Sequence, residues 1–221
     1  MLATLGPALI RTPAAPQDRP VAPMALPGDP LRIVALGTSL TARATWPDAL
    51  ARALAACSGR RVALRVVAEP GADVRRGLEA ASRLGEPAPD IVLIEFSAND
   101  ADLLDGLFPS SALGQTGRLI DVLRQKMPEA RIVLMTMNPV TGLRRHLQRP
   151  FLELHDAGYR RLSVERGVGL VDLAPRWAAR PDLAAALPDG LHPDPGTATE
   201  LMLPVLLPYL GAAIGATCPG G

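Results

Sequence analysis

Cysteine, aromatic residues and charge of one sign are all scarce in this chain of 221 residues. The only two cysteines, Cys57 and Cys218, are too few for a disulfide framework and match no zinc spacing, while a single disulfide stays open. Aromatic residues make up 3% of the chain, which argues against stacking platforms for single-stranded nucleic acids. The net charge is +1, whereas proteins that bind phosphate backbones usually carry a clear basic excess. We therefore expect no nucleic-acid partner.

Long hydrophobic runs and a basic leader are also missing. The most apolar stretch, residues 201–215, is short for a membrane span and is interrupted by Pro204 and Pro208, so we expect a helix packed on a soluble core. No basic residue precedes the modest apolar run at the N-terminus, so no signal peptide is predicted. The sequence thus indicates a protein without a membrane span.

Prolines dominate the first part of the chain, with seven of them over residues 7–30 and little hydrophobic periodicity. We expect a Pro-rich tail or linker over residues 1–30, one domain over residues 31–215 and a short C-terminal tail over residues 216–221. Such leaders are common on exported proteins. The sequence therefore leans slightly toward an exported or periplasmic location and leaves the compartment open.

Short apolar runs alternate with helical patterns after Pro30, and 48% hydrophobic residues suffice for a sizeable core. This alternation predicts an α/β fold in which helices cover both faces of a five-stranded parallel sheet. The expected strands are residues 31–37, 62–67, 91–96, 132–137 and 168–173. The expected helices begin at 47 and near 74, then cover 119–126, 151–165 and 197–210, the last one kinked or broken by its prolines.

Residues with useful chemistry stand just after these strands, where ligands of such folds bind. One edge of the sheet would bring together five groups: a hydroxyl, an amide N–H beside a glycine, a side-chain amide, a carboxylate and an imidazole. These are the parts for acyl transfer with an activated serine. They are supplied by Ser39, Gly71, Asn99, Asp189 and His192.

The roles follow from what each group can do. An imidazole titrating near neutrality suits a base that takes the serine proton, so His192 is expected to activate Ser39. A carboxylate must hold the other ring N–H, and Asp189 lies three residues before His192 on a turn. The charge that develops on the carbonyl oxygen needs donors, for which the amides of Ser39 and Gly71 and the side chain of Asn99 are the candidates.

Four sequence blocks resemble those of the SGNH hydrolases, also called the GDSL esterase/lipase family. Its Gly-Asp-Ser-Leu block matches residues 37–40, its second-block glycine matches Gly71, and its Gly-x-Asn-Asp block matches residues 97–100. Its Asp-x-x-His block matches residues 189–192. The resemblance covers roughly residues 31–215 and rests on the order of the blocks, since each motif alone is weak.

This resemblance implies a flavodoxin-like three-layer α/β/α sandwich and hydrolysis of esters or thioesters without a metal or other cofactor. It implies Ser39 as nucleophile, His192 as base and Asp189 as the residue that orients the base. The implied oxyanion donors are Ser39, Gly71 and Asn99. No oligomeric state follows from the sequence.

Two positions depart from the family pattern. Thr38 replaces the motif aspartate, so the hydrogen bonds around the nucleophile loop must differ. Ser97 replaces a glycine, which matters for the backbone path into Asn99 if that position needs a positive φ. Thr38 and Asn138 are candidates to line the substrate site, although Asn138 is as easily read as a strand cap.

Three further groups have plain structural alternatives. Asp100, Asp102 and Asp105 lack calcium-loop spacing and are better explained as a solvated acidic turn. A basic run, 144–149, could recognise an anionic substrate or form a solvated helix face. Apolar residues between 103 and 108 could line an acyl pocket, form a lid or simply pack a helix.

The sequence predicts a serine esterase that acts through an acyl-enzyme on a small-molecule or carbohydrate ester. Short acyl groups, such as acetyl groups on carbohydrate, are favoured because no long apolar segment builds a lipid tunnel. Lysophospholipase or thioesterase activity is an alternative, as is a catalytically silent carbohydrate-binding domain. The nucleophile elbow of α/β-hydrolases fails at Thr41, and a flavin-binding module would leave Asp189 and His192 unexplained.

Overall fold

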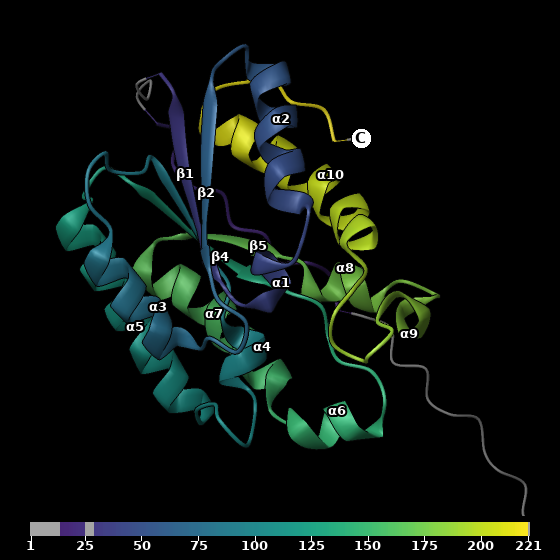
Figure 1. Cartoon of the computed structure of the whole chain (residues 1–221). Coiled ribbons are helices and arrows are strands. Elements are labelled where there is room, and N and C mark those ends of the chain that lie inside the picture. Colours follow the sequence, from purple (N-terminus) through teal and green to yellow (C-terminus); the bar gives the residue numbers. More distant parts are fainter. Residues whose placement is uncertain (1–13, 25–28, 221) are drawn as a thin grey trace, which may run out of the picture.

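Five strands form the centre of the molecule (Figure 1), whose computed structural model describes residues 14–24 and 29–220. The strands are β1 (Leu31–Gly37), β2 (Val62–Ala68), β3 (Ile91–Ile94), β4 (Arg131–Thr136) and β5 (Gly169–Asp172). All neighbours in the order β2-β1-β3-β4-β5 are parallel. The order reverses after β1, so the loops that follow β1 and β3 open at a topological switch point.

Helices cover both faces of the sheet, which confirms the predicted three-layer α/β/α sandwich. One layer is formed by α2 (Trp46–Ser58) and α10 (Pro195–Ala213), and the other by α3 (Val74–Arg83), α5 (Pro109–Lys126) and α7 (Leu152–Arg166). Short helices follow the strand ends or precede the last loop. They are α1 (Ser39–Ala42), α4 (Ser97–Asp100), α6 (Leu143–Gln148), α8 (Ala174–Ala178) and α9 (Leu183–Ala186).

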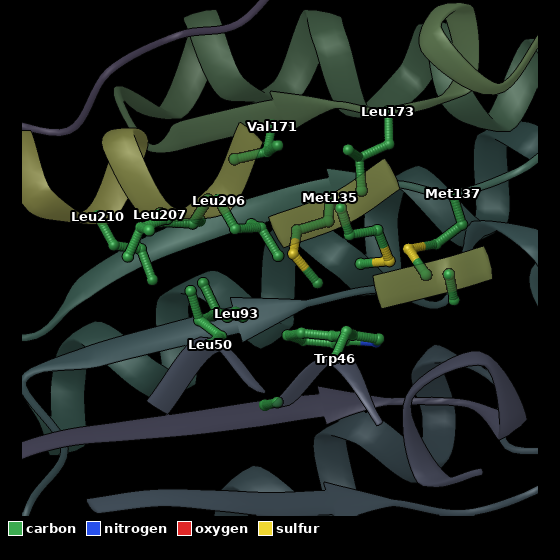
Figure 2. Close-up of a cluster of buried hydrophobic side chains, with 14 of the residues drawn as sticks. Trp46, Leu50, Leu93, Met135, Met137, Val171, Leu173, Leu206, Leu207 and Leu210 are labelled. Carbon is green, nitrogen blue, oxygen red and sulfur yellow. The ribbon is translucent and has the colours of Figure 1, made fainter. Parts of the chain in front are cut away.

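Strand β3 shows why its sequence is an unbroken apolar run. Successive side chains of a strand point to opposite faces, and here both faces are covered. Ile91 and Leu93 therefore pack toward α2 and α10, whereas Val92 and Ile94 pack toward α3, α5 and α7. Figure 2 shows the first of these cores, in which the ring of Trp46 from α2 and leucines of α10 lie on the same face of the sheet.

Most predicted bounds differ by one to three residues from the observed ones, and α5 begins at Pro109, ten residues before the predicted start. Two further differences have a physical explanation. β3 ends at Ile94 instead of residue 96. Glu95 still donates its backbone N–H to Leu36 of β1 while its carboxyl binds the loop after β1, but the N–H of Phe96 turns to the hydroxyl of Tyr159. Helix α10 is continuous through Pro204 and Pro208, so of the kink or break that the sequence predicted, the break is absent. Burial of its leucines on the core offsets the two backbone hydrogen bonds that the prolines cannot donate. Within the described part of the chain, no helix combines the length and apolar character of a membrane span.

Residues 14–24 lie along the free edge of β5. Arg19 and Leu170 exchange two backbone hydrogen bonds of 2.9 Å, and the N–H of Met24 reaches the carbonyl of Ala213. Asp18 accepts the N–H of Asp172 and forms an ion pair with Arg176. This segment therefore shields the outer edge of the sheet from other strands.

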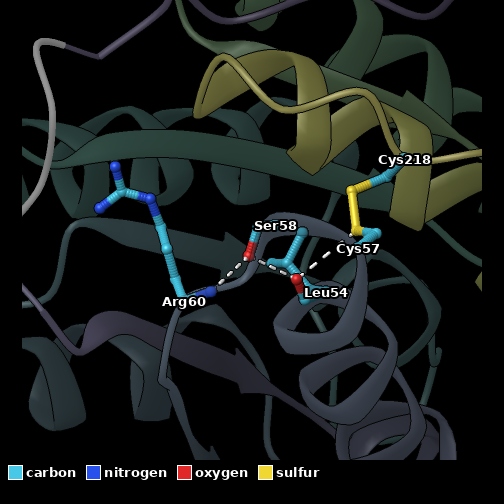
Figure 3. Close-up of a disulfide and its surroundings, with 5 residues drawn as sticks. All are labelled: Leu54, Cys57, Ser58, Arg60 and Cys218. Carbon is cyan, nitrogen blue, oxygen red and sulfur yellow. Dashed lines mark hydrogen bonds between the residues drawn. A yellow bond between two sulfur atoms is a disulfide. The ribbon is translucent and has the colours of Figure 1, made fainter.

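Cys57 and Cys218 form a disulfide, which settles a pairing that the sequence left open (Figure 3). Cys57 lies in the last turn of α2, and Cys218 follows α10, which packs beside α2. The bond joins positions 161 residues apart and fastens the chain end to the amino-terminal edge of the sheet, away from the loops that follow the strands.

Candidate active site

Ser39 opens α1 directly after β1. Thr38 caps this short helix because its side chain accepts the N–H of Leu40, so the chain turns sharply at the serine. Ser39 Oγ lies 2.8 Å from Nε2 of His192, although the two residues are 153 positions apart. The serine is buried, with 7% of its surface exposed, and its hydroxyl meets the imidazole at the carboxyl edge of the sheet.

Asp189 and His192 are joined by a local turn. Asp189 Oδ2 lies 2.8 Å from His192 Nδ1, and Oδ1 accepts the backbone N–H groups of Leu191 and His192. An ionised carboxylate can only accept, so Nδ1 carries the proton and Nε2 faces Ser39 as an acceptor. Burial pushes the pKa of Asp189 upward, but the hydrogen bonds from His192 and Leu191 outweigh it and hold this pKa below its usual range.

Gly190 shapes this turn. Its φ is +80°, and an added Cβ would come within 2.4 Å of the carbonyl oxygen of Thr141. Glycine alone satisfies both the positive φ and the close approach. A glycine at position 190 is thus required by the backbone that follows β4.

Gly71 and Asn99 lie on the loops that flank β1. The N–H of Ala72 bonds to Glu69 across Pro70 and Gly71, and Gly71 has φ +81°, as the third position of a type II turn requires. Asn99 Nδ2 donates to the carbonyl of Ala72 at 2.9 Å, which ties the two loops together. Among the described residues, the N–H groups of Ser39 and Gly71 have no acceptor, and Asn99 keeps one amide hydrogen free. Three donors therefore remain available on loops that begin at adjacent strands.

Both departures from the family pattern find partners. Thr38, in place of the motif aspartate, donates its N–H to Glu95 Oε1 at 2.6 Å and also contacts that carboxyl through its hydroxyl. Ser97 donates its hydroxyl to Asp156 at 2.9 Å. In the described part of the chain only glycines have positive φ, so the path into Asn99 does not require a glycine at position 97.

Glu95 is the residue that sequence reasoning missed. It is fully buried at the end of β3 and accepts the hydroxyl of Thr41 at 2.7 Å in addition to the contacts from Thr38. Burial raises its pKa to about 7, against which the hydrogen bonds from Thr38 and Thr41 act. An acidic residue inside the apolar run of residues 91–96 was the available signal, because a charge there needs a specific partner.

Asn138 and the other candidates lie outside the catalytic contacts. Asn138 is 2% exposed, and its Nδ2 donates to the carbonyl of Leu191 at 2.7 Å, so it supports the turn that carries His192. Asp100 is buried and accepts the N–H of Val74, while Asp102 pairs with Arg149. No cluster of three metal-ligating side chains occurs within residues 14–24 and 29–220.

A cavity of about 310 Å³ opens beside the Ser39–His192 pair. Most of its lining residues are apolar, and the ionisable residues among them are Arg43, Asp189 and His192. The remaining lining residues are Ser39, Leu40, Ala44, Pro193, Pro195 and Ala198. A serine and an oriented imidazole beside a small cavity, with free N–H donors on the neighbouring loops, form an arrangement that can transfer acyl groups.

Comparisons with known proteins find solved structures of similar fold. Solved structures that resemble the chain include the lipase/acylhydrolase from Enterococcus faecalis, which is 20% identical, with a TM-score of 0.70 and coverage of 86% of this chain and 99% of that one. Axe2, an acetylxylan esterase from Geobacillus stearothermophilus, is 18% identical, with a TM-score of 0.66 and coverage of 85% and 95%. At these identities the likeness shows the fold. Comparison with curated proteins finds no significant match.

The sequence itself carries the family assignment. The GDSL-like lipase/acylhydrolase family matches residues 33–196, a segment that contains Ser39, Asn99, Asp189 and His192. The chain belongs to the GDSL-like lipase/acylhydrolase family.

Proposed function

We propose that the chain hydrolyses carboxylic esters through an acyl-enzyme formed on Ser39. The observation that carries this proposal is the continuous chain of contacts from Ser39 Oγ to His192 and from His192 to Asp189, each 2.8 Å long. His192 Nε2 takes the hydroxyl proton while Oγ attacks the ester carbonyl carbon. Asp189 holds the ring and stabilises the imidazolium, which then protonates the leaving alcohol. A water molecule, activated by the same imidazole, releases the acid and restores Ser39.

The oxyanion of each tetrahedral intermediate is proposed to be bound by the N–H groups of Ser39 and Gly71 and by Asn99 Nδ2. Support comes from the loops on which they lie and from the hydrogen bond between Asn99 and Ala72 that holds those loops together. Fixed donors cost no reorganisation when negative charge develops on the carbonyl oxygen. Thr38 is buried below the nucleophile and Asn138 below the His192 turn, so both are proposed to support the site instead of contacting substrate.

A short acyl group is the proposed substrate feature, with acetyl esters of carbohydrate as one instance. The cavity beside Ser39 has about 310 Å³ and is lined in part by Pro193 and Pro195, a size that suits a small acyl group better than a long chain. The likeness to a protein described as an acetylxylan esterase is consistent with this substrate class. A silent carbohydrate-binding domain would have no use for the oriented imidazole.

A lipid ester is the second candidate, and one observation favours it. Leu103, Leu104 and Phe108, in the connection between α4 and α5, are 55%, 80% and 72% exposed. Apolar side chains this exposed could contact an acyl chain that extends beyond the cavity. Long-chain or lysophospholipid substrates would use that surface, whereas acetyl esters would not reach it.

The test is hydrolysis of a chromogenic ester series from acetyl to palmitoyl by the wild type, Ser39→Ala, His192→Ala and the exposed-serine control Ser111→Ala. We expect the wild type and the control to cleave short esters, and the first two variants to lose turnover while keeping their unfolding temperature. Equal cleavage by Ser39→Ala would refute the nucleophile. A maximum at long chains would replace the short-acyl proposal with the lipid alternative.

The disulfide supports a proposal for location. Disulfides persist in exported and periplasmic proteins and are rare in reducing cytosol. The Cys57–Cys218 bond therefore favours an oxidising compartment. A thiol assay on protein from the native host tests this: fully oxidised cysteines are expected, and two free thiols would contradict the proposal.

A further inference from the structure

Arg145 of α6 contacts Asp189, the carboxylate at the end of the chain of contacts that runs from Ser39 through His192. Its Nη2 donates to Asp189 Oδ2 at 3.0 Å, and its Nε donates to the carbonyl oxygen of Asp189, also at 3.0 Å. The guanidinium thus contacts both the side chain and the backbone of Asp189. Its side chain is 20% exposed, compared with 46% for Asp189, so the ion pair lies partly open to solvent.

The oxygen that Arg145 contacts is the one that also accepts from His192. Asp189 Oδ2 receives the imidazole Nδ1–H at 2.8 Å and the guanidinium at 3.0 Å. Because the positive charge of Arg145 partly neutralises the Asp189 carboxylate, Asp189 stabilises a protonated His192 less than a carboxylate without a second cation would.

Arg145 is itself held in place by a hydrogen bond to Gln148 of the same helix. Its Nη1 donates to Gln148 Oε1 at 3.2 Å, and Gln148 in turn donates to Asp102 at 2.7 Å. The same segment of chain also bonds the two residues after Asp189, because Thr141 N–H reaches the carbonyl of Gly190 and Asn138 reaches that of Leu191. The connection after β4 thus fixes the whole turn that carries the proposed base.

From this geometry we infer that Arg145 is a positioning residue of the reaction, which clamps Asp189 and sets the pH at which His192 becomes an available base. The inference rests on the proposed function. The other charged residues near this pair are Arg43, which lines the same cavity, Asp194, two positions after His192, and Arg149, whose charge also acts on Asp189. Arg149 forms its ion pair with Asp102, and neither Arg43 nor Asp194 pairs with Asp189, so among these charges only Arg145 contacts the carboxylate directly.

The experiment compares wild type, Arg145→Gln, Arg145→Met and Arg145→Lys, with Arg144→Gln as the matched control. Arg144 is the exposed neighbour on the same helix and makes no ion pair with another described residue. Two quantities are measured from pH 4 to 9. One is kcat and KM for p-nitrophenyl acetate. The other is the rate at which a fluorophosphonate modifies Ser39, followed by intact mass; in that reaction the serine oxygen bonds phosphorus, fluoride leaves and His192 takes the proton.

In Arg145→Gln and Arg145→Met we expect the acid limb of both profiles to move up by roughly half a pH unit, since a partly exposed cation acts less than a buried one. The plateau kcat should fall about threefold to tenfold, with little change in KM, because the carboxylate is less firmly held. Arg145→Lys keeps the charge, so its acid limb should stay near that of the wild type. Arg144→Gln should match the wild type in both readouts.

The failures are distinguishable. Absence of Ser39 modification in the wild type, or equal turnover by Ser39→Ala, overturns the proposed function and this inference with it. An unmoved acid limb in the two uncharged variants, with Ser39 still reactive, overturns the inference alone, whatever happens to kcat. An equal shift in Arg145→Lys and Arg145→Gln would show that lost packing, not charge, is responsible, and it too contradicts the inference.

Discussion

Glu95 lies directly beneath Thr38, and Glu95 Oε1 accepts the Thr38 backbone N–H at 2.6 Å. The carboxyl also reaches Gly37, where an added Cβ would come within 2.2 Å of Oε1, so position 37 tolerates glycine alone. No cation lies against Glu95 in the described residues, and the pKa is raised to about 7 by burial. The loop that presents Ser39 is therefore fastened to β3 by a carboxyl that keeps its proton at acidic pH.

Replacing Glu95 by glutamine should change how stability depends on pH. The folded-state pKa of Glu95, about 7, lies above its ordinary value of 4.5, so its contribution is full below pH 4.5 and is lost as pH rises through 7. Glutamine stays neutral and can still accept the N–H of Thr38. The unfolding free energy of the wild type should therefore fall relative to that of Glu95→Gln as pH rises from about 5 to 8.

Urea unfolding at half-unit pH steps measures this difference. Asp100 and Asp156 are also buried carboxyls with raised pKa values, of about 8 and 7, and they remain in both proteins, so to first order they cancel. The exposed Glu129→Gln serves as the control and should show a flat difference. A flat difference for Glu95→Gln as well would mean that Glu95 is ionised across the whole range.

Asn99→Ala should lower kcat about a hundredfold or more, because it removes a side-chain donor proposed for the oxyanion. KM and the unfolding temperature should change much less, since the amide makes one hydrogen bond to Ala72 in the resting protein. Steady-state kinetics on p-nitrophenyl acetate measures the effect, with Asn99→Asp as a same-size variant that cannot donate. A wild-type kcat in both variants would remove Asn99 from the mechanism.

Local spacing explains what could be predicted from sequence. The Asp189 and His192 pair was predictable because a spacing of three residues around a glycine brings the two side chains together on one turn. The sheet was predictable because a strand such as Ile91–Ile94 is apolar on both faces, which only a covered parallel sheet requires. The chain order of the blocks then placed Ser39 at the same edge.

The rest depends on contacts between distant segments. The bond between Thr38 and Glu95 follows from the pairing of β1 with β3, in which Leu36 lies opposite Ile94. The salt bridge of Arg145 with Asp189 requires α6 to fold back over a turn 44 residues away, so sequence reasoning could offer a basic cluster and no partner. The choice between a kinked and a broken α10 could not be made from the sequence, because the burial that offsets the lost hydrogen bonds is a property of packing.

Gly190→Ala should displace the turn that carries the proposed base. An alanine there meets a φ of +80° and the carbonyl oxygen of Thr141. We expect a loss of about 1–3 kcal/mol in unfolding free energy and at least a tenfold fall in kcat. The control is Gly59→Ala at the end of α2, which shares a positive φ of 67° but has nothing within 4 Å of the added Cβ. It should lose stability through strain while keeping kcat, and a normal kcat in Gly190→Ala would show that the turn relaxes without moving His192.

Reducing the disulfide should destabilise the protein without disabling the site. Cys57 and Cys218 are 161 residues apart, so the cross-link removes much of the freedom of the unfolded chain, and its loss should cost about 3–5 kcal/mol. Urea unfolding of oxidised and reduced wild type measures this cost without a change in sequence. Cys57→Ser combined with Cys218→Ser should match the reduced protein, apart from the cost of placing a hydroxyl at the buried position 218. Below the unfolding transition kcat should stay within about twofold, because the bond lies at the opposite edge of the sheet from Ser39. Equal unfolding free energies for the two redox forms would show that α2 and α10 hold the chain end by packing alone.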